Sequence, residues 1–324
     1  MIWRTLKIAA LCLAAAMAAG LTPAAAQSFP GQPIKIVIGF GPGSAADILA
    51  RLLGKQMEAK LGQPIVVENR PGNSSMLAAE AVGRATPDGY TLFMATIANT
   101  LNPAQTNSNF NLGKDLAPIA LLGVVPNVLV VHPSVPAGNL KELIALAKSK
   151  PDSLTFGSSG NGTASHMAAE LFNQKAGTKI VVAPYQGGSN QAVTDLLAGR
   201  ITLMFNVAAT LAPHVEAGSL KAIAVAQSQR AAIMPNVPTL AEAGMAGYDA
   251  GIWIGLLAPA GTPPAIIEKL SGAANEALKT ADVQTALKRQ GTDPLGSTPK
   301  EFSDFIRADI DKWVAALTAA GLRK

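Results

Sequence analysis

Three glycine-rich stretches contain most of the residue types that could bind a ligand. The stretches Gly39 to Asp47, Gly157 to Thr163 and Tyr185 to Gln191 each follow an apolar, β-branched run and precede an amphipathic stretch. Glycines let backbone N–H groups converge, and a helix that follows directs the positive end of its dipole at the same point. Because Asp47 is the single charged residue in the three stretches, their pattern is typical of a site that holds an anion through neutral donors.

The first stretch also permits a nucleotide-binding interpretation. Gly39, Gly41 and Ser44 approach the spacing G-x-G-x-x-G, and Glu68 ends the next apolar run, where a ribose-binding acid would lie. Ser44 replaces the third glycine, and together with Asp47 it fits a helix capping box instead. An exported oxidoreductase therefore stays an alternative, while Asp47 is expected to act mainly at the helix start.

The histidines and serines do not form a recognisable catalytic or metal-binding pattern. Gly157 to Thr163 precedes His166, but a G-x-S-x-G elbow needs a glycine where Asn161 stands, so an exported esterase is a weaker alternative. His132 and His214 are isolated, and no H-x-x-H spacing occurs. We therefore expect no catalytic residue, no metal site and no cofactor.

The N-terminal 26 residues have the pattern of a secretory signal peptide. Arg4 and Lys7 precede an apolar run, and three alanines end the segment. Gly20 and Pro23 interrupt the run before it reaches the length of a membrane span. The single cysteine, Cys12, lies inside this segment, so a mature chain from residue 27 has no disulfide and no thiolate metal ligand. The sequence thus predicts a cleaved signal peptide over 1–26 and a periplasmic protein.

Composition limits the remaining possibilities. The chain has 324 residues, of which 49% are hydrophobic and 15% charged, which suits about two globular domains. The formal charge is +5, and it falls to +3 without the first 26 residues. This charge is too small for a nucleic-acid-binding surface, and the 5% content of aromatic residues offers few stacking platforms.

Apolar runs and amphipathic stretches alternate along the chain, which predicts an α/β fold with parallel strands and crossover helices. The predicted strands cover 34–38, 65–67, 90–94, 128–131, 154–156, 180–182, 201–205 and 222–225, and the clearest helices cover 45–61, 264–279 and 300–320.

Two segments, 123–133 and 251–264, have the character of crossings between domains. Two crossings imply that one domain is discontinuous. We expect residues 27–125 plus 250–324 to form domain 1 and residues 126–249 to form domain 2. A cleft between two α/β lobes is a favoured place for a small-molecule site.

The sequence resembles the substrate-binding proteins of tripartite tricarboxylate transporters, also called the Bug family, over essentially the whole mature chain. The resemblance is carried by the order of nine short stretches, each weak alone: 41–51, 67–72, 86–92, 102–103, 157–166, 185–188, 195–199, 238–244 and 257–263.

This resemblance implies a two-lobed periplasmic binding protein of the Venus-flytrap type, a monomer that closes on a small organic carboxylate and delivers it to membrane permease subunits. A carboxylate sensor for a signalling receptor would use the same site and is a further alternative. In this family the glycine-rich loops hold carboxylates through backbone amides and water. The implied ligand-binding residues are Gly41, Pro42, Gly43, Ser44, Ala45, Ala46, Asp47, Ser158, Ser159, Gly162, Thr163, Gly187, Gly188 and Ser189, with Ala95 and Asn206 as walls.

Three positions depart from the family pattern. The family has a hydroxyl residue at the position of Ala46, commonly a lysine at Gln186 and commonly an aspartate at Asn206. These departures bear on the identity of the ligand rather than on the fold.

Overall fold

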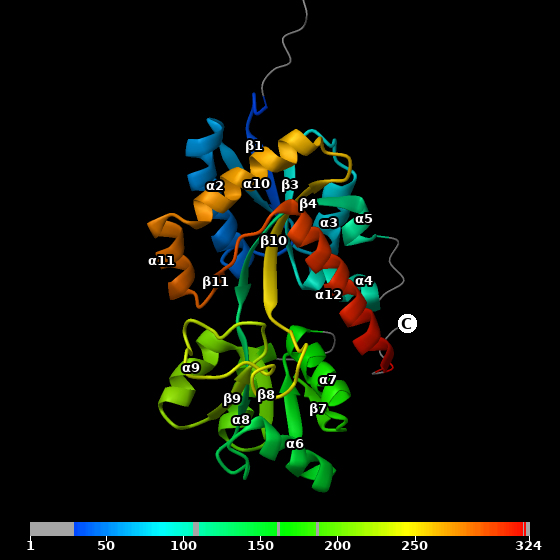
Figure 1. Cartoon of the computed structure of the whole chain (residues 1–324), viewed down its shortest axis with the longest axis vertical. Coiled ribbons are helices and arrows are strands. Elements are labelled where there is room, and N and C mark those ends of the chain that lie inside the picture. Colours follow the sequence, from blue (N-terminus) through cyan, green and yellow to red (C-terminus); the bar gives the residue numbers. More distant parts are fainter. Residues whose placement is uncertain (1–28, 106–109, 161–162, 186–187, 320, 322–324) are drawn as a thin grey trace, which may run out of the picture.

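Two mixed β-sheets form the centres of two lobes (Figure 1). The structure is a computed structural model that describes residues 29–105, 110–160, 163–185, 188–319 and 321. Within these residues, one six-stranded sheet has the order β11-β4-β10-β3-β1-β2, and one five-stranded sheet has the order β7-β6-β8-β5-β9. The predicted two-lobed α/β fold is confirmed.

The strands of the first sheet are β1 (Ile34–Ile38), β2 (Ile65–Asn69), β3 (Thr91–Thr96), β4 (Leu116–Val125), β10 (Ile252–Pro259) and β11 (Asp293–Pro294). Those of the second are β5 (Asn127–Val131), β6 (Thr155–Ser158), β7 (Val181–Pro184), β8 (Leu203–Val207) and β9 (Lys221–Val225).

The expectation of parallel strands is wrong for the strands near the connection between the lobes. Strands β1, β2 and β3 are parallel, but β10 is antiparallel to both of its neighbours, β3 and β4. The reason is the path of the chain. It leaves the first sheet through β4 and returns through β10, so these adjacent strands run in opposite directions without a crossover helix. In the second sheet β5 is likewise antiparallel to β8 and β9.

Helices cover both faces of the first sheet, as the alternation of side chains on its strands requires. Ile36 and Ile38 of β1 pack with one set of helices, and Val37 packs with the other. The first set is α2 (Ala45–Leu61), α10 (Pro264–Leu278) and α11 (Ala281–Arg289); the second includes α3 (Met76–Gly83), α4 (Ala98–Gln105), α5 (Leu112–Asp115) and α12 (Pro299–Ala319).

The second sheet carries α6 (Leu140–Ser149), α7 (Ala164–Ala176), α8 (Gly188–Leu197) and α9 (Ala208–Glu216). Two short 3-10 turns, η1 (Asn73–Ser75) and η2 (Pro151–Ser153), complete the elements.

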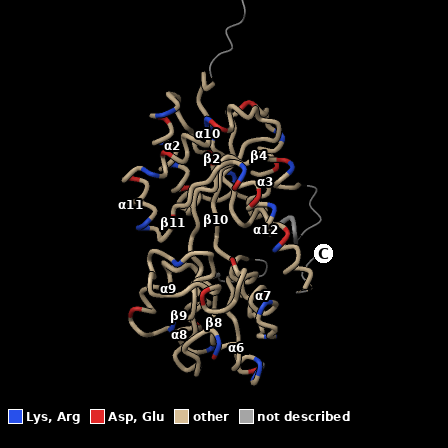
Figure 2. The backbone as a smooth tube through the Cα atoms, viewed as in Figure 1, with Lys and Arg blue, Asp and Glu red and all other residues tan. Residues whose placement is uncertain are grey.

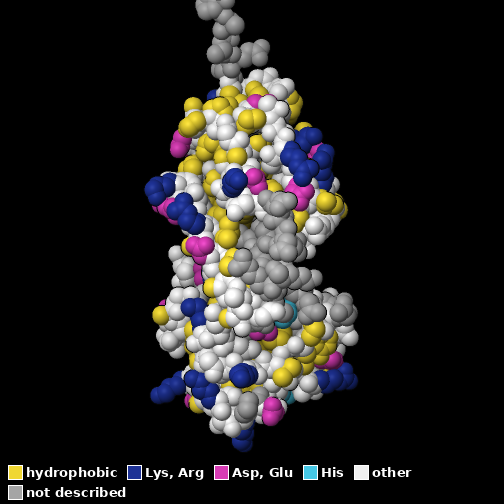
Figure 3. Space-filling view, turned by 90° about the vertical axis from the view of Figure 1, so that its right-hand side faces the viewer, with side chains coloured by type: hydrophobic (Ala, Val, Ile, Leu, Met, Phe, Trp, Pro, Cys, Tyr) yellow, Lys and Arg dark blue, Asp and Glu magenta, His cyan; other side chains and the backbone are white. Residues whose placement is uncertain are grey.

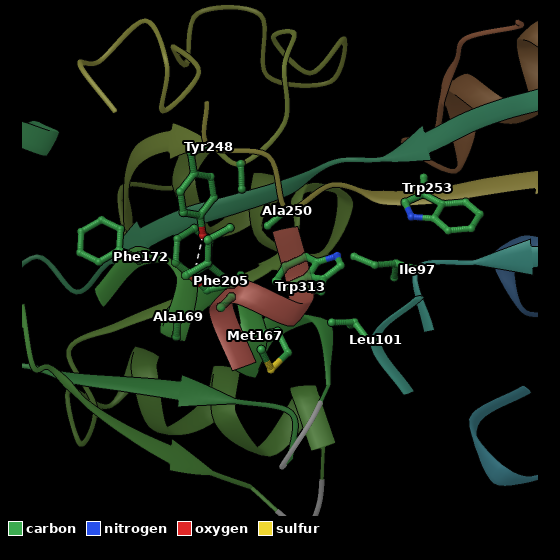
Figure 4. Close-up of a cluster of buried hydrophobic side chains, with 14 of the residues drawn as sticks. Ile97, Leu101, Met167, Ala169, Phe172, Phe205, Tyr248, Ala250, Trp253 and Trp313 are labelled. Carbon is green, nitrogen blue, oxygen red and sulfur yellow. Dashed lines mark hydrogen bonds between the residues drawn. The ribbon is translucent and has the colours of Figure 1, made fainter. Parts of the chain in front are cut away.

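One hydrophobic cluster extends through both lobes (Figure 4). Trp313 of α12 lies between Ile97 and Leu101 of the first lobe and Met167 of α7 in the second. Further into the second lobe, the Tyr248 hydroxyl donates a 2.6 Å hydrogen bond to a backbone carbonyl of α7. Helix α12 therefore joins the lobes along one side, while β4 and β10 join them through the middle (Figure 1).

The surface shows two bulky lobes with a waist between them (Figure 3). Lysine and arginine residues are scattered along the described chain in both lobes and are interspersed with acidic residues (Figure 2). No helix in the described part of the chain is long and apolar enough to cross a membrane. The predicted signal peptide, residues 1–26, lies outside the described residues.

Candidate functional site

A cleft of about 460 Å³ lies between the lobes beside the strands that connect them. Among the residues that the structure describes, none of those lining it is charged. They are Phe40, Ser44, Ala45, Ala46, Asn73, Ser74, Thr96, Ile97, Ala98, Leu101, Val125, Thr163, Ala164, Ile252 and Ile254. The cleft therefore has the neutral character that the glycine-rich turns predict.

Three helices begin at this cleft. Ala45, Ala98 and Ala164 are the first residues of α2, α4 and α7, and each lines the cleft. The first N–H groups of a helix have no partner within the helix, and they carry the positive end of its dipole. Since α2 and α4 belong to the first lobe and α7 to the second, both lobes direct donors at the space between them.

The start of α2 is held by Asp47, a residue that is 3% exposed. Its carboxylate accepts hydrogen bonds from Gly43 N at 2.9 Å, from Asn69 Nδ2 at 2.9 Å and from Arg51 Nε at 3.1 Å. Ser44 Oγ in turn accepts from the Asp47 N–H at 3.3 Å. The capping box predicted for Ser44 and Asp47 is confirmed in part. The Ser44 side chain caps the helix, but the Asp47 carboxylate accepts from Gly43 N instead of the Ser44 N–H that a capping box uses.

These contacts also set the ionisation of Asp47. Burial by itself raises the pKa of this carboxyl, but the hydrogen bonds from Arg51, Gly43 and Asn69 and the charge of Arg51 outweigh burial. They hold its pKa below the ordinary value of 3.8. Asp47 is thus an ionised residue that fixes the loop preceding α2, and it does not itself line the cleft.

The segment Asn73–Ser75 brings a second, strained loop to the cleft. Its three residues have φ of 46°, 49° and 75°, in the left-handed region that non-glycine residues rarely adopt. Asn73 and Ser74 line the cleft, while Ser75 is buried against Gly39. Backbone strain of this kind persists where the surrounding structure fixes it, and it concentrates at ligand sites.

Gly39 makes this arrangement possible. A Cβ atom at position 39 would lie 1.9 Å from Ser75 Oγ and 2.4 Å from Ser75 Cα. We expect Gly39→Ala to lower the free energy of unfolding by about 1–3 kcal/mol, because the strained segment must move to admit the methyl group. Urea unfolding measures this loss. Gly41→Ala is the matched control, since a Cβ there meets nothing within 4 Å, and equal stability of the two variants would contradict the close approach.

In the second lobe, hydroxyl groups order the loop between β6 and α7. Thr163 is the N-cap of α7, and its hydroxyl donates to the Gly160 carbonyl at 2.7 Å. Ser159 Oγ lies 2.8 Å from Ser165 Oγ, and Ser159 N donates to the same oxygen at 2.9 Å. This network fixes the start of α7 at the edge of the cleft.

The residues expected to bind ligand differ in how close to the cleft the structure places them. Four of them line the cleft: Ser44, Ala45, Ala46 and Thr163. Gly41, Pro42 and Gly43 lie in the loop before α2, Asp47 lies in the first turn of α2, Ser158 ends β6 and Ser159 follows it. Gly188 and Ser189 begin α8, Ala95 is buried within β3 and Asn206 is buried within β8. Gly162 and Gly187 lie outside the described residues, as does Gln186.

Two of these residues carry buried polar atoms without a hydrogen bond. Ser158 Oγ and Asn206 Nδ2 make none within the described chain. Both residues lie in neighbouring strands of the second sheet, β6 and β8. Because buried polar groups are normally satisfied, such atoms point to a further partner.

The sequence did not single out most of the apolar lining residues. Ile97, Leu101, Val125, Ile252 and Ile254 have the appearance of ordinary core residues, and only the arrangement of the lobes exposes one side of them to a cleft. Asn73 and Ser74 follow Gly72 in a small, polar stretch, which is a weak loop signal.

Glu68 and His166, which suggested an oxidoreductase and an esterase, form ion-pair contacts outside the cleft. Glu68 forms ion pairs with Lys35, at 2.8 Å, and with Arg70. His166 Nε2 lies 3.6 Å from a carboxylate oxygen of Glu170 in the same helix. Neither Glu68 nor His166 lines the cleft. Within the described residues, no group of three or more His, Cys, Asp or Glu side chains is placed to hold a metal ion.

The fold and the cleft define a two-lobed solute-binding protein, and comparison with known proteins agrees. Residues 49–322 match the model of the tripartite tricarboxylate transporter family receptor, TctC. Protein BugT of Bordetella pertussis is 34% identical over 304 residues, which cover 93% of each chain. The chain therefore belongs to the TctC receptor family, and the resemblance seen in the sequence is confirmed.

Solved structures show the same fold. A TctC solute-binding protein from Polaromonas superposes with a TM-score of 0.84 at 27% identity, over 90% of this chain and 100% of that one. MatC from Rhodopseudomonas palustris, solved with bound malate, has a TM-score of 0.67 at 31% identity, over 89% of this chain and 100% of that one.

Proposed function

We propose that this protein captures a small organic carboxylate in the cleft between its lobes and presents it to the membrane subunits of a tripartite transporter. The observation that carries the proposal is the meeting of three helix N-termini, from both lobes, in a cleft where no described lining residue is charged. Helix starts favour negative charge without a buried cation, which would cost desolvation energy. The malate bound to MatC, a family relative, supports a carboxylate as the ligand.

In this proposal the protein binds and releases its ligand unchanged. The loops 41–47 and 158–163 and the start of α8 hold the carboxylate, and the buried donors Ser158 Oγ and Asn206 Nδ2 add to them through the ligand or water. Delivery to a transporter is favoured over presentation to a signalling receptor because the chain belongs to a transporter receptor family.

The proposal includes a periplasmic location, reached through a signal peptide cleaved after residue 26. Mass spectrometry of the protein isolated from its natural host tests both parts. Under denaturing conditions the mass should correspond to a chain starting at Gln27, and under native conditions the complex should carry an organic acid. A neutral or cationic copurifying molecule as the sole ligand would contradict the carboxylate function.

We further propose that residues 27–125 plus 250–324 and residues 126–249 move as two bodies of a monomer. Hinge motion at β4–β5 and at the return to β10 would close the cleft, because a ligand that contacts both lobes favours the closed state. The radius of gyration from X-ray scattering should fall when the copurifying acid is added to saturation. An unchanged value, or scattering from a dimer, would contradict this part.

A further inference from the structure

An apolar wall forms about half of the cleft. Val125, Ile252 and Ile254 come from the connecting strands β4 and β10. Phe40 follows β1, Ile97 follows β3 and Leu101 belongs to α4. The donors of the three helix starts lie among small residues, so the cleft combines a polar part that suits a carboxylate with an apolar part that must contact the rest of the ligand.

The pairing of the connecting strands fixes this wall. Ile252 of β10 pairs with Val125 of β4. Alternate residues of a strand point to the same side, so Ile252 and Ile254 both face the cleft. Trp253 between them lies against the other side, where its Nε1 donates to Asp309 at 2.9 Å. A one-residue shift of β10 against β4 would turn Trp253 toward the cleft and break this buried contact.

The hydroxyl groups that line the cleft belong to helix starts and turns, in the polar part of the cleft, and not to the apolar wall. Ser44 and Thr96 accept from backbone N–H groups three and two residues further along the chain, both at 3.3 Å. Thr163 donates to a carbonyl three residues earlier at 2.7 Å. The other two polar lining residues, Asn73 and Ser74, are exposed. The wall itself offers no hydrogen-bond partner to a ligand hydroxyl.

We propose that the cleft selects carboxylates with an unsubstituted hydrocarbon skeleton over hydroxy acids of the same length and charge. This inference rests on the carboxylate-binding function proposed above and names its ligand class. A hydroxyl group pressed against the wall loses its water without gaining a partner, whereas a CH₂ group gains contact. The preference would differ from that of a protein built to hold malate.

Calorimetric titrations at neutral pH, on protein dialysed free of bound acid, test the preference with three matched pairs: succinate and malate, adipate and galactarate, and phenylacetate and mandelate. Within each pair the charge and skeleton are the same, and the second acid adds hydroxyl groups. In every pair that binds, we expect the unsubstituted acid to bind at least tenfold more tightly, because an unpaired buried hydroxyl costs about this much or more.

Ile252→Thr tests whether the apolar wall causes the preference for unsubstituted acids. The change adds a hydroxyl group to the wall and keeps a β-branched side chain suited to a strand. It should reduce the ratio of affinities within a pair several-fold. Ile266→Thr in α10 is the matched control, because Ile266 is also half-buried but lies outside the cleft lining. It should leave the ratio unchanged.

The possible results distinguish failure of the selectivity from failure of the carboxylate-binding function. Equal or tighter binding of the hydroxy acids overturns the selectivity and leaves carboxylate binding intact. Absence of binding by all six acids overturns both. An affinity ratio that Ile252→Thr leaves as large as in the parent protein overturns the assignment to the wall.

Discussion

Asp309→Ala is expected to lower the free energy of unfolding by about 3–5 kcal/mol, because it leaves two buried tryptophan N–H donors without a partner and removes the ion pair with the half-buried Lys312. Asp309 is 2% exposed. Its carboxylate accepts from Thr100 Oγ1 at 2.7 Å, Trp253 Nε1 at 2.9 Å and Trp313 Nε1 at 3.1 Å, and Lys312 Nζ lies at 2.5 Å. A loss of this size is a large part of the stability of an ordinary domain.

The position of Asp309 makes this loss relevant to the cleft. Thr100 belongs to α4, which begins at the cleft, and Trp253 stands between two residues of the apolar wall. The carboxylate therefore ties α12 to two elements that form the site. Urea unfolding followed by circular dichroism measures the effect. Asp311→Ala, an exposed change in the same helix, should stay within about 0.5 kcal/mol of the parent. A similarly small effect of Asp309→Ala would contradict the assigned contacts.

Asp47→Asn is expected to weaken the binding of the copurifying acid at least tenfold and to lower the free energy of unfolding by about 1–3 kcal/mol. An asparagine side chain cannot accept from Gly43 N, Asn69 Nδ2 and Arg51 as a carboxylate does, so the loop before α2 loses its anchor. Calorimetry and urea unfolding measure the two effects. Asp282→Asn is the control, since Asp282 stands in the first turn of α11 but is exposed. It should cost a few tenths of a kcal/mol.

The stabilising effect of Asp47 should also depend on pH. Because the pKa of Asp47 is lower in the folded protein than its ordinary value of 3.8, the stability it contributes is present above that value. It is lost as the pH falls through the folded pKa. The stability difference between the parent and Asp47→Asn should thus be constant near neutral pH and shrink below about pH 3.8. A difference that grows on acidification would contradict the ionised, hydrogen-bonded state of Asp47.

Local signals in the sequence were sufficient to predict β1 and α2, the strand and helix that flank the first loop of the site. The predicted ranges 34–38 and 45–61 coincide with β1 and α2, because a β-branched run, a glycine-rich turn and a capping serine act over a few residues. The actual partners of Asp47 could not be predicted in full, since Asn69 reaches it from the end of β2, 22 residues further along the chain.

Features that depend on distant parts of the chain were missed. The left-handed conformation of Asn73–Ser75 carries no signal in residues that are not glycine, and the close approach of Gly39 that accompanies it is a tertiary contact. Ile252 and Ile254 lie in the segment 251–264, which was predicted to cross between the domains, but their exposure to the cleft depends on how the second lobe is placed. For the same reason the antiparallel direction of β10 was not foreseen.

The most direct test of an anion-binding cleft compares an acid with its neutral amide at neutral pH. Calorimetric titration with succinate against succinamide, and with phenylacetate against phenylacetamide, changes the charge while nearly preserving the shape. Helix N–H groups form stronger hydrogen bonds with a carboxylate than with an amide, so the amide of any acid that binds should bind at least about tenfold more weakly. Equal affinity for acid and amide would contradict recognition of negative charge by the helix starts of this cleft.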